Sequence, residues 1–517
     1  MKTFNKLALL IFLLIILAGC SKKNPAINNI GDATSDNTIV LAAGRHLAPG
    51  NYDAYYCSKT LGVWEPLITG DDNGRPAPAL AESWQILDGG KVWVFKLRQG
   101  VTFHDGTEFS ADSVVKNFDR AKLGVKRSIF YGLDLNTFYP GLEKYEQVDK
   151  YTFKLTFKEA NINQLYKMMD FGSPIFAPAC FAANGNFNGP AIGTGPFKIK
   201  NNVLGKYVEL ERYEGYYGRK AQTKYITVRN IPNADVRYAA LKAGEILGVL
   251  DINALPPFLA TELAKDSRFE ISTNKSGMIR FLALNGTNFP FNDQRMRRAV
   301  SLAINRPQLV EALYANYAKP SSNLLSYASP YHQESPPVYD LALAKKLAYE
   351  VLGDKRLELV YYFNASEPLQ KSEAELIAYW LKDIGLDVQT RSLEYATLVH
   401  TIRKGQYHIA RLQQGLPNGD PYPIFYSFMM PQGSRNRSSS LGYSNPEVAE
   451  LLRQVKHSTY EPERQALYAR LQELSIQEQP IVPLFNDISI VACSKRLKNY
   501  HALTYGLDLA TVELVDE

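Results

Sequence analysis

His104 and Asp105 are adjacent in the sequence, and their side chains are of the types that perform general acid–base chemistry. They stand in a Phe-His-Asp-Gly segment at residues 103–106, whose glycine is typical of a turn. The sequence contains no Gly-x-Ser-x-Gly segment, no Ser/His/Asp order and no paired-carboxylate motif to accompany them. A hydrolase therefore finds no support, and we expect a protein that is not an enzyme and uses no catalytic cofactor.

Cysteine and histidine, the residues that most often hold transition metals, are few and dispersed. The chain has four cysteines and seven histidines, with no CxxC pair and no Cys/His cluster of the kind that binds zinc. Cys57, Cys180 and Cys493 are an odd set, so at least one of them has no disulfide partner within the chain. We expect buried structural cysteines, and the sequence leaves their pairing open.

The fourth cysteine, Cys20, closes an N-terminal segment with the layout of a secretory signal. A short basic region precedes an apolar run at residues 7–17, which is too short to span a membrane. The Leu-Ala-Gly tripeptide before Cys20 resembles the lipobox of bacterial lipoproteins, which implies removal of residues 1–19 and lipid modification of Cys20. Residues 20–37 are polar and typical of a flexible tether. We predict an extracytoplasmic, membrane-anchored lipoprotein of the periplasm or cell surface, and Ser21 leaves open which membrane holds it.

The charge and composition of the chain argue against a nucleic-acid partner. The formal net charge is +6, and removal of the two signal lysines lowers it to +4, with no tract rich in Lys or Arg. No later segment has a long uncharged apolar run, so we expect the exported chain to be soluble apart from its anchor. The 32 Tyr and 24 Phe suit a protein that grips ligands with amphipathic rings, although large cores use them as well.

Short strands and amphipathic helices alternate through the rest of the chain. Residues 38–43 and 92–97 are typical of strands, and Ser110 is typical of a helix N-cap. A second α/β region begins near Phe281, with predicted helices at residues 295–304, 374–384 and 462–476 and predicted strands at 357–363 and 481–485. This interleaving predicts α/β layers, and 517 residues predict more than one domain.

Several sequence motifs stand in a fixed order from about residue 38 to about residue 495. They are Trp-Glu-Pro-Leu at 64–67, Pro-Ala-Leu-Ala-Glu-Ser-Trp at 78–84, the run at 88–106, Gly-Thr-Gly-Pro-Phe at 193–197, and the segment at 285–306. In this order they resemble the family 5 extracellular solute-binding proteins, which serve peptide, nickel and related ABC importers. His104 lies inside this scaffold signature, which favours a structural role for it.

The resemblance implies an α/β, two-lobed periplasmic-binding-protein fold of type II, in the large family 5 form with a hinge. Lobe I would be discontinuous, built from residues 38–284 and 481–517 with an inserted subdomain at about 70–192, and lobe II would span residues 285–480. The solute would bind between the lobes, whose closure presents it to an ABC importer permease in the inner membrane. We expect the protein to be a monomer.

Short peptides are one cargo that the resemblance implies. Peptide-binding relatives carry an aspartate shortly before an acidic/Pro pair in the second lobe, where it meets the amino terminus of the peptide. The matching positions here are Pro417 and Asn418, before Asp420 and Pro421. A buried ammonium without a carboxylate partner is costly. Dipeptide or oligopeptide binding is therefore the alternative hypothesis.

The nickel-binding branch is similar in having an arginine followed three residues later by an aromatic residue, here Arg127 and Phe130. The resemblance implies that Arg127 pairs with a carboxylate of a small nickel chelator and that Phe130 lines the cavity; a solvated Arg127 is the alternative. The metal-binding histidine of those relatives is missing, and His46 and His501 are candidates to replace it because neutral imidazole suits Ni(II). Each of the two could instead be a surface histidine. Ni(II) with a chelator such as free histidine is the predicted cargo.

Overall fold

The computed structural model describes residues 38–47, 59–71, 74–123, 135–160, 162–189, 191–416, 421–458, 460–504 and 506–515. The predicted positions Cys20, Arg127, Phe130 and Asp420, and also Cys57, lie outside these residues. Among the helices of the described part, none is both long and apolar enough to cross a membrane.

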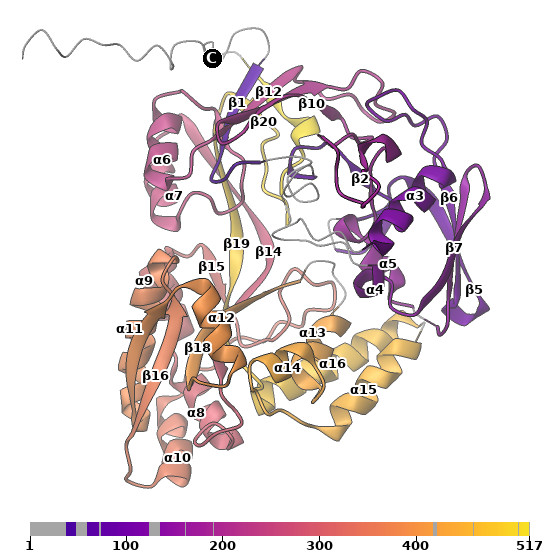
Figure 1. Ribbon diagram of the computed structural model, residues 1–517. Coiled ribbons are helices and arrows are strands. Elements are labelled where there is room, and N and C mark those ends of the chain that lie inside the picture. The colour runs from indigo at the N-terminus through magenta and orange to yellow at the C-terminus, as the bar shows by residue number, and fades with distance from the viewer. Residues whose placement is uncertain are drawn as a thin grey trace, which may run out of the picture.

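One large sheet runs through the molecule and joins two lobes (Figure 1). Its strand order is β10-β11-β12-β1-β13-β19-β14-β18-β16-β17, with β15 paired to β19. The strands are β1 (Thr38–Ala43), β10 (Phe197–Val203), β11 (Tyr207–Arg212), β12 (Tyr225–Asn230), β13 (Gly248–Val249), β14 (Phe269–Leu284), β15 (Ala318–Pro320), β16 (Leu357–Asn364), β17 (Leu386–Leu393), β18 (Ile409–Gly415) and β19 (Val482–Ser494). β1 pairs with β12 and β13 in parallel, as expected of strands linked by helical crossovers.

The antiparallel pair β14 and β19 connects the lobes. β14 is 16 residues long, and its pairing with β19 extends from Phe269 opposite Ser494 to Leu282 opposite Val482. The register shifts between Lys275 and Ile279, so the ladder is irregular near the middle of β14. In Figure 1 these two strands run from lobe I at the top to lobe II below. The pair is therefore the structural element at which the lobes are hinged.

Lobe I is discontinuous, because segments from both ends of the described chain share its core. Ile39, Leu41 and Ala43 of β1 belong to the same apolar cluster as Tyr500 and Val512. The other face of the sheet is covered by α6 (Ala234–Lys242) and α7 (Pro257–Leu263), which bury a second cluster. The remaining short elements are β2 (Glu65–Pro66), β3 (Ile68–Gly70), β4 (Pro76–Pro78), β9 (Pro174–Ile175), β20 (Leu497–Lys498), β21 (Glu513–Leu514), α4 (Leu135–Phe138) and α5 (Gln164–Met168).

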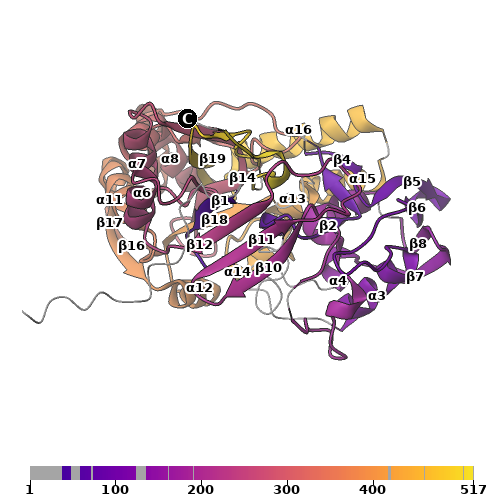
Figure 2. The ribbon, with the colours of Figure 1, turned by 90° about the horizontal axis from the view of Figure 1, so that it is seen from above.

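A four-stranded antiparallel sheet forms the inserted part of lobe I. Its order is β5 (Ala81–Leu87), β6 (Val92–Leu97), β8 (Thr152–Phe157) and β7 (Leu142–Asp149), and α3 (Ala111–Lys122) packs near β7. Trp93 is fully buried in its core, and Trp84 is partly buried against the same cluster. Viewed from above, this sheet lies at the far side of the molecule from the lobe II elements α11 (Pro368–Leu381) and β16 (Figure 2).

Lobe II packs helices on both sides of β14, β16 and β18. One cluster contains Leu282, Leu359 and Leu381, and the other contains Phe281, Phe425 and Tyr468. Besides α11, the helices are α8 (Gln294–Ala303), α9 (Arg306–Tyr314), α10 (Leu341–Leu352), α12 (Tyr395–Arg403), α13 (Tyr422–Met429), α14 (Ser434–Ser438), α15 (Pro446–His457) and α16 (Glu461–Glu478). The side chains of adjacent β14 residues alternate between these two clusters, as the pleat requires. The residue limits proposed for the two lobes stay a prediction.

Candidate binding cleft

The residues that follow the carboxyl ends of the parallel strands β1 and β13 lie together beside β19, which runs on toward lobe II. The Gly44 N–H donates to Oδ2 of Asp251 over 2.8 Å, and Arg45 Nε lies 4.0 Å from Oδ1. Burial raises the pKa of Asp251, and the charge of Arg45 opposes that shift. Parallel strand ends of this kind are the usual place for a ligand in α/β sheets. Asp251 thus brings a buried carboxyl to the position where a solute would be expected.

His46, one of the two predicted metal ligands, follows β1 at this same edge. Both of its ring nitrogens are buried, and neither forms a well-aligned hydrogen bond in the described part of the chain, although the Asn202 side chain lies within reach of the ring. Burial lowers the pKa of His46, and the nearby Asn202 side chain offsets only part of that shift. The ring is therefore neutral at pH 7, which is the form that coordinates metals or shares a hydrogen bond with a ligand. Buried polar atoms without partners are rare and call for an explanation.

His501, the second predicted metal ligand, is also in lobe I but is exposed. It follows Tyr500, whose ring is buried and would touch a Cβ at Gly248 at 2.9 Å. The Tyr500 hydroxyl is buried without a partner in the described residues. His46 is partly buried at the end of β1, whereas His501 is exposed. Their metal role stays a prediction.

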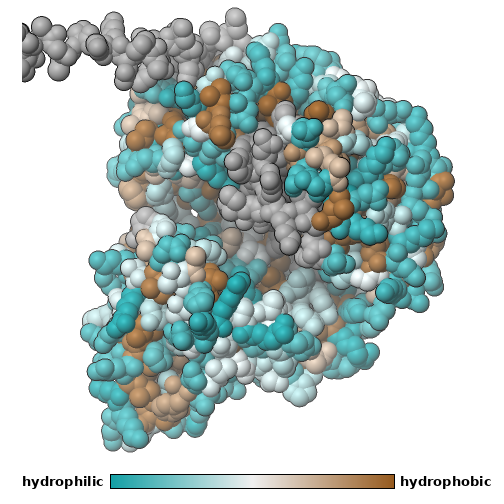
Figure 3. Space-filling model, viewed as in Figure 1, coloured by the Kyte–Doolittle hydropathy of each residue, from teal (hydrophilic) through white to brown (hydrophobic). Residues whose placement is uncertain are grey.

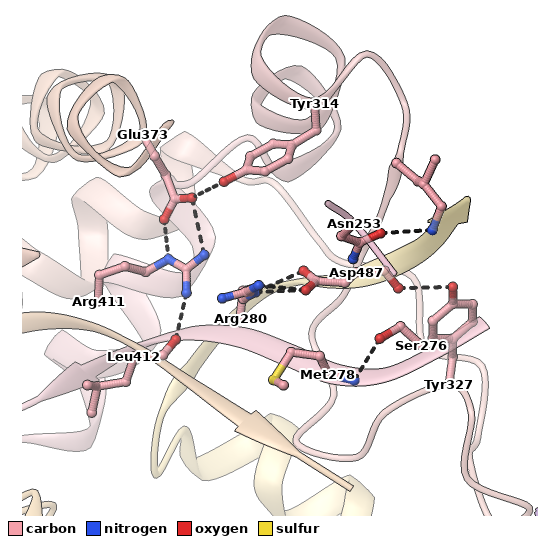
Figure 4. Close-up of polar contacts among 11 residues, drawn as sticks. Asn253, Ser276, Met278, Arg280, Tyr314, Tyr327, Glu373, Arg411, Leu412 and Asp487 are labelled. Carbon is pink, nitrogen blue, oxygen red and sulfur yellow. Dashed lines mark hydrogen bonds and ion pairs between the residues drawn. The ribbon is translucent and has the colours of Figure 1, made fainter. Parts of the chain in front are cut away.

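An ion pair joins the two hinge strands β14 and β19 (Figure 4). Nε of Arg280 on β14 lies 2.9 Å from Oδ1 of Asp487 on β19, and a terminal guanidinium nitrogen lies 2.7 Å from Oδ2. The two side chains are 18% and 12% exposed, so the pair is only partly shielded from water. The Tyr327 hydroxyl donates to the Asp487 carbonyl over 3.1 Å. The two-point contact between Arg280 and Asp487 fixes the relative position of both strands.

A second ion pair lies deeper in lobe II and serves the fold. Arg411 of β18 pairs with Glu373 of α11, and both side chains are almost completely buried. The Tyr314 hydroxyl donates to the same carboxylate over 2.7 Å (Figure 4). The carboxylate thus has partners on both oxygens, which is the condition under which a buried pair is tolerated.

The scaffold motifs of the sequence hold turns and strands in place. His104 Nε2 lies 2.9 Å from the Gly195 carbonyl oxygen, and its ring packs edge-on against Tyr213. Burial lowers the pKa of His104 to about 4, so it is neutral and holds two turns together. Glu65 accepts hydrogen bonds from Thr194 and from two tyrosines. Neither His104 nor Asp105 lies at the strand ends described above, in agreement with the predicted structural role.

The surface is hollowed between the two lobes, on the side of α7 and α9 (Figure 3). In the described residues no group of three or more His, Cys, Asp or Glu side chains is placed to hold a metal ion. Arg127 and Phe130, the predicted contacts of a nickel chelator, lie outside the described residues.

Three residues of this region were not singled out from the sequence. Asp251 follows the short apolar strand β13. An acidic residue at the end of such a strand is a sequence pattern from which a binding residue could have been predicted. Arg280 and Asp487 are 207 residues apart, so no local pattern pairs them.

A family model described as "Bacterial extracellular solute-binding proteins, family 5 Middle" matches residues 75–436. The glutathione-binding protein GsiB of Escherichia coli K12 is 26% identical over 480 residues, which cover 89% of this chain and 91% of GsiB.

Two solved structures share the fold over almost their whole length. NikA from Brucella suis, in complex with Fe(III)-EDTA, has a TM-score of 0.81 at 24% identity and covers 92% of this chain and 100% of its own. The periplasmic binding protein DppA from Helicobacter pylori, in complex with the peptide STSA, has a TM-score of 0.73 at 25% identity and covers 92% and 98%. The two-lobed type II binding-protein architecture is thereby confirmed.

Proposed function

Because the chain belongs to the bacterial extracellular solute-binding proteins of family 5, we propose that its cargo is nickel held by a small carboxylate chelator. Free histidine is such a chelator. Proteins of this family bind solutes outside the cytoplasm for ABC importers and are not enzymes. Closure of the lobes about the β14–β19 hinge would bury the complex and present it to the permease.

His46 is the observation that carries this proposal. Its two nitrogens are buried at the lobe I strand ends, with no well-aligned hydrogen bond among the described residues and only the Asn202 side chain within reach, and its lowered pKa keeps the ring neutral. Ni(II) favours imidazole nitrogen, and a chelate that already fills most of its coordination sphere needs only one or two protein ligands. His501 is the proposed second ligand. Arg127 would pair with the chelator carboxylate and Phe130 would line the cavity.

A short peptide of about the size of glutathione is the second candidate cargo. GsiB is named for glutathione, and the DppA structure holds a peptide. Asp251 supports this candidate, because its Oδ1 is buried without a hydrogen bond from the described residues, and the nearest cation, Arg45, is 4.0 Å away. That oxygen could receive a peptide ammonium and so replace the carboxylate that is missing at Pro417 and Asn418.

Isothermal titration calorimetry separates the two candidates. The purified protein is titrated with Ni(II), with Ni(II) plus L-histidine, with glutathione and with a mixture of short peptides. The same titrations follow on His46→Ala and His501→Ala, with the exposed His400→Ala of α12 as the matched control. We expect Ni(II)–histidine to bind and His46→Ala to weaken it by more than the roughly 10–100-fold that loss of an outer-shell partner costs.

The outcomes of this experiment are distinct. Binding of glutathione or peptides with no response to nickel refutes the nickel proposal and supports the second candidate. Normal nickel binding by both His46→Ala and His501→Ala refutes the ligand assignment while leaving nickel as the cargo.

We further propose that the exported chain is anchored through a lipid on Cys20, as its lipobox-like segment implies. One acyl chain would bind a membrane only marginally, whereas a multiply acylated cysteine holds stably. Mass spectrometry of the N-terminal peptide from a bacterial membrane fraction tests this anchor. Release of the Cys20→Ser variant into the soluble fraction is the expected result, and an unmodified Cys20 peptide would refute it.

A further inference from the structure

A basic pocket lies in lobe I, at the opposite end of the sheet from the cleft. Its volume is about 720 Å³, and its lining includes Lys242, Arg268, Lys495, Arg496 and Lys498 but no acidic side chain among the described residues. Cations gathered on one concave surface raise the local positive potential, which the nearby Asp266 carboxylate offsets in part. The cleft residues described above do not contribute to this pocket.

Two of the five cations are already paired. Arg268 makes a two-point contact with Asp266 at 3.1 and 2.7 Å, and Lys242 lies 4.0 Å from the same carboxylate. The other three have no ion-pair partner in the part of the chain that the structure describes. The Nε–H group of Arg496 is buried and donates no hydrogen bond to those residues. Leaving a buried donor without an acceptor is energetically costly. These three cations are therefore available to an anion from outside.

The pocket lies beside the point where the chain enters lobe I. Leu247 lines it, and the Leu247 N–H donates to the carbonyl of Val40, which is the third residue of β1, over 2.7 Å. Phe269, the first residue of β14, also lines it. Arg280 stands eleven positions further along this strand, so the hinge ion pair is roughly 35 Å away at ~3.3 Å per residue.

We propose that this pocket binds the phosphate group of an anionic phospholipid headgroup and so holds this end of lobe I against the membrane. Guanidinium and ammonium groups are the side chains that bind phosphate. The choice of a lipid as the source rests on the proposed anchor at Cys20. Residues 20–37 precede β1, so a membrane anchor at Cys20 would lie within ~60 Å of the first residue of β1 even if the segment were fully extended. A basic surface beside a lipid anchor is a known way to strengthen membrane attachment.

Vesicle co-sedimentation tests the pocket separately from the anchor. The exported chain, residues 20–517 with Cys20→Ser, is mixed with vesicles of phosphatidylglycerol and phosphatidylcholine or of phosphatidylcholine alone. The variant Lys495→Glu/Lys498→Glu reverses the charge at two exposed positions of the pocket. The control Lys345→Glu/Lys346→Glu makes the same change in net charge at exposed positions of α10. Each lysine near an anionic surface contributes about fivefold to binding, so we expect the pocket variant to lose roughly 25-fold.

Support requires that the α10 variant binds anionic vesicles nearly as the wild-type chain does, and that Ni(II)–histidine and peptide titrations are unchanged in the pocket variant. Equal losses in the two variants, or equal binding to both kinds of vesicle, would overturn the proposal. Displacement from vesicles by millimolar inorganic phosphate at constant ionic strength would also overturn it, since it would assign the pocket to free phosphate. If Cys20 carries no lipid, mass spectrometry will show an unmodified N-terminal peptide. That result would not affect the vesicle experiment, which uses the Cys20→Ser chain.

Discussion

Arg280 of β14 and Asp487 of β19 form a two-point ion pair at the place where both strands pass from lobe I to lobe II. Asp487 stands two residues beyond Phe485, which is the direct register partner of Arg280. The contact is therefore diagonal across the ladder. It holds the strands together between the two places where the register shifts, one after Lys275 and one after Arg280.

Removing one charge of this pair should destabilise the protein. Asp487→Asn leaves the Arg280 guanidinium partly buried without its counter-charge, and we expect the free energy of unfolding to fall by about 2–4 kcal/mol. Urea denaturation followed by circular dichroism measures the change. The double variant Arg280→Met/Asp487→Leu is the control, because replacing both charges by apolar groups should recover most of the loss. A loss below about 0.5 kcal/mol in Asp487→Asn, the range of ordinary surface substitutions, would contradict a hinge role for the pair.

His104 should make the stability of the protein depend on pH. Burial lowers its pKa from 6.5 to about 4 in the folded chain, so the unfolded chain binds the proton more tightly. The contribution of neutral His104 is fully present above pH 6.5 and is lost progressively as the pH falls toward about 4. The loss over this window is on the order of 2–3 kcal/mol.

Urea denaturation at pH 7 and pH 5 measures this dependence. His104→Gln keeps an amide N–H that can donate to the Gly195 carbonyl, but it does not titrate. We expect the difference in stability between the two pH values to shrink in this variant. Part of it should remain, because burial also lowers the pKa values of His46, His332 and His408. An unchanged difference would show that His104 is not the group responsible.

Much of the fold could be predicted because its local patterns agree with its tertiary contacts. Residues 38–43 form β1 with the predicted limits, and Ser110 precedes α3 as its N-cap. The helix predicted at 295–304 is α8, displaced by one residue. In these segments the apolar period and the capping residue suffice to define the element.

The hinge strands could not be predicted to their full length. The predicted strand at 481–485 stops where the apolar run ends, whereas β19 continues to Ser494 through Asn486 and Ser489, which are 1% and 0% exposed. Polar residues within a short window argue against a buried strand. Their partners come from β14, more than 200 positions earlier, so only tertiary pairing extends the strand. The Arg280–Asp487 pair could not be predicted for the same reason, because its two residues are far apart in the sequence.

A methyl group at Gly195 should strongly destabilise lobe I. A Cβ there would lie 2.3 Å from the Gly62 carbonyl oxygen and 2.8 Å from the Val63 carbonyl carbon, and both are backbone atoms that cannot move aside easily. We expect Gly195→Ala to lower the free energy of unfolding by about 3 kcal/mol or more, at the upper end of overpacking costs. Gly415→Ala is the matched control, because its Cβ would meet only Met278 Cε at an ordinary 3.6 Å. Equal urea midpoints for the two variants would contradict the close approach at Gly195.

The two described cysteines should be unreactive in the folded protein. Burial raises the pKa of Cys180 to about 11, despite the Ile192 N–H that donates to its sulfur, and raises that of Cys493 to about 12. Both are free thiols in the core of lobe I. At pH 8 only about 0.1% or less of a thiol with such a pKa is thiolate, the form that reacts, and burial also blocks access to it.

Iodoacetamide labelling, followed peptide by peptide in a mass spectrometer, measures this reactivity. Neither Cys180 nor Cys493 should be modified in the folded chain within the time that labels both in about 6–8 M urea, a concentration at which a protein of ordinary stability is unfolded. The urea sample is the control, because it shows that both peptides can be labelled and detected. Labelling of either cysteine at the same rate with and without urea would show that its surroundings open readily, and such a thiol could not be a structural part of the core.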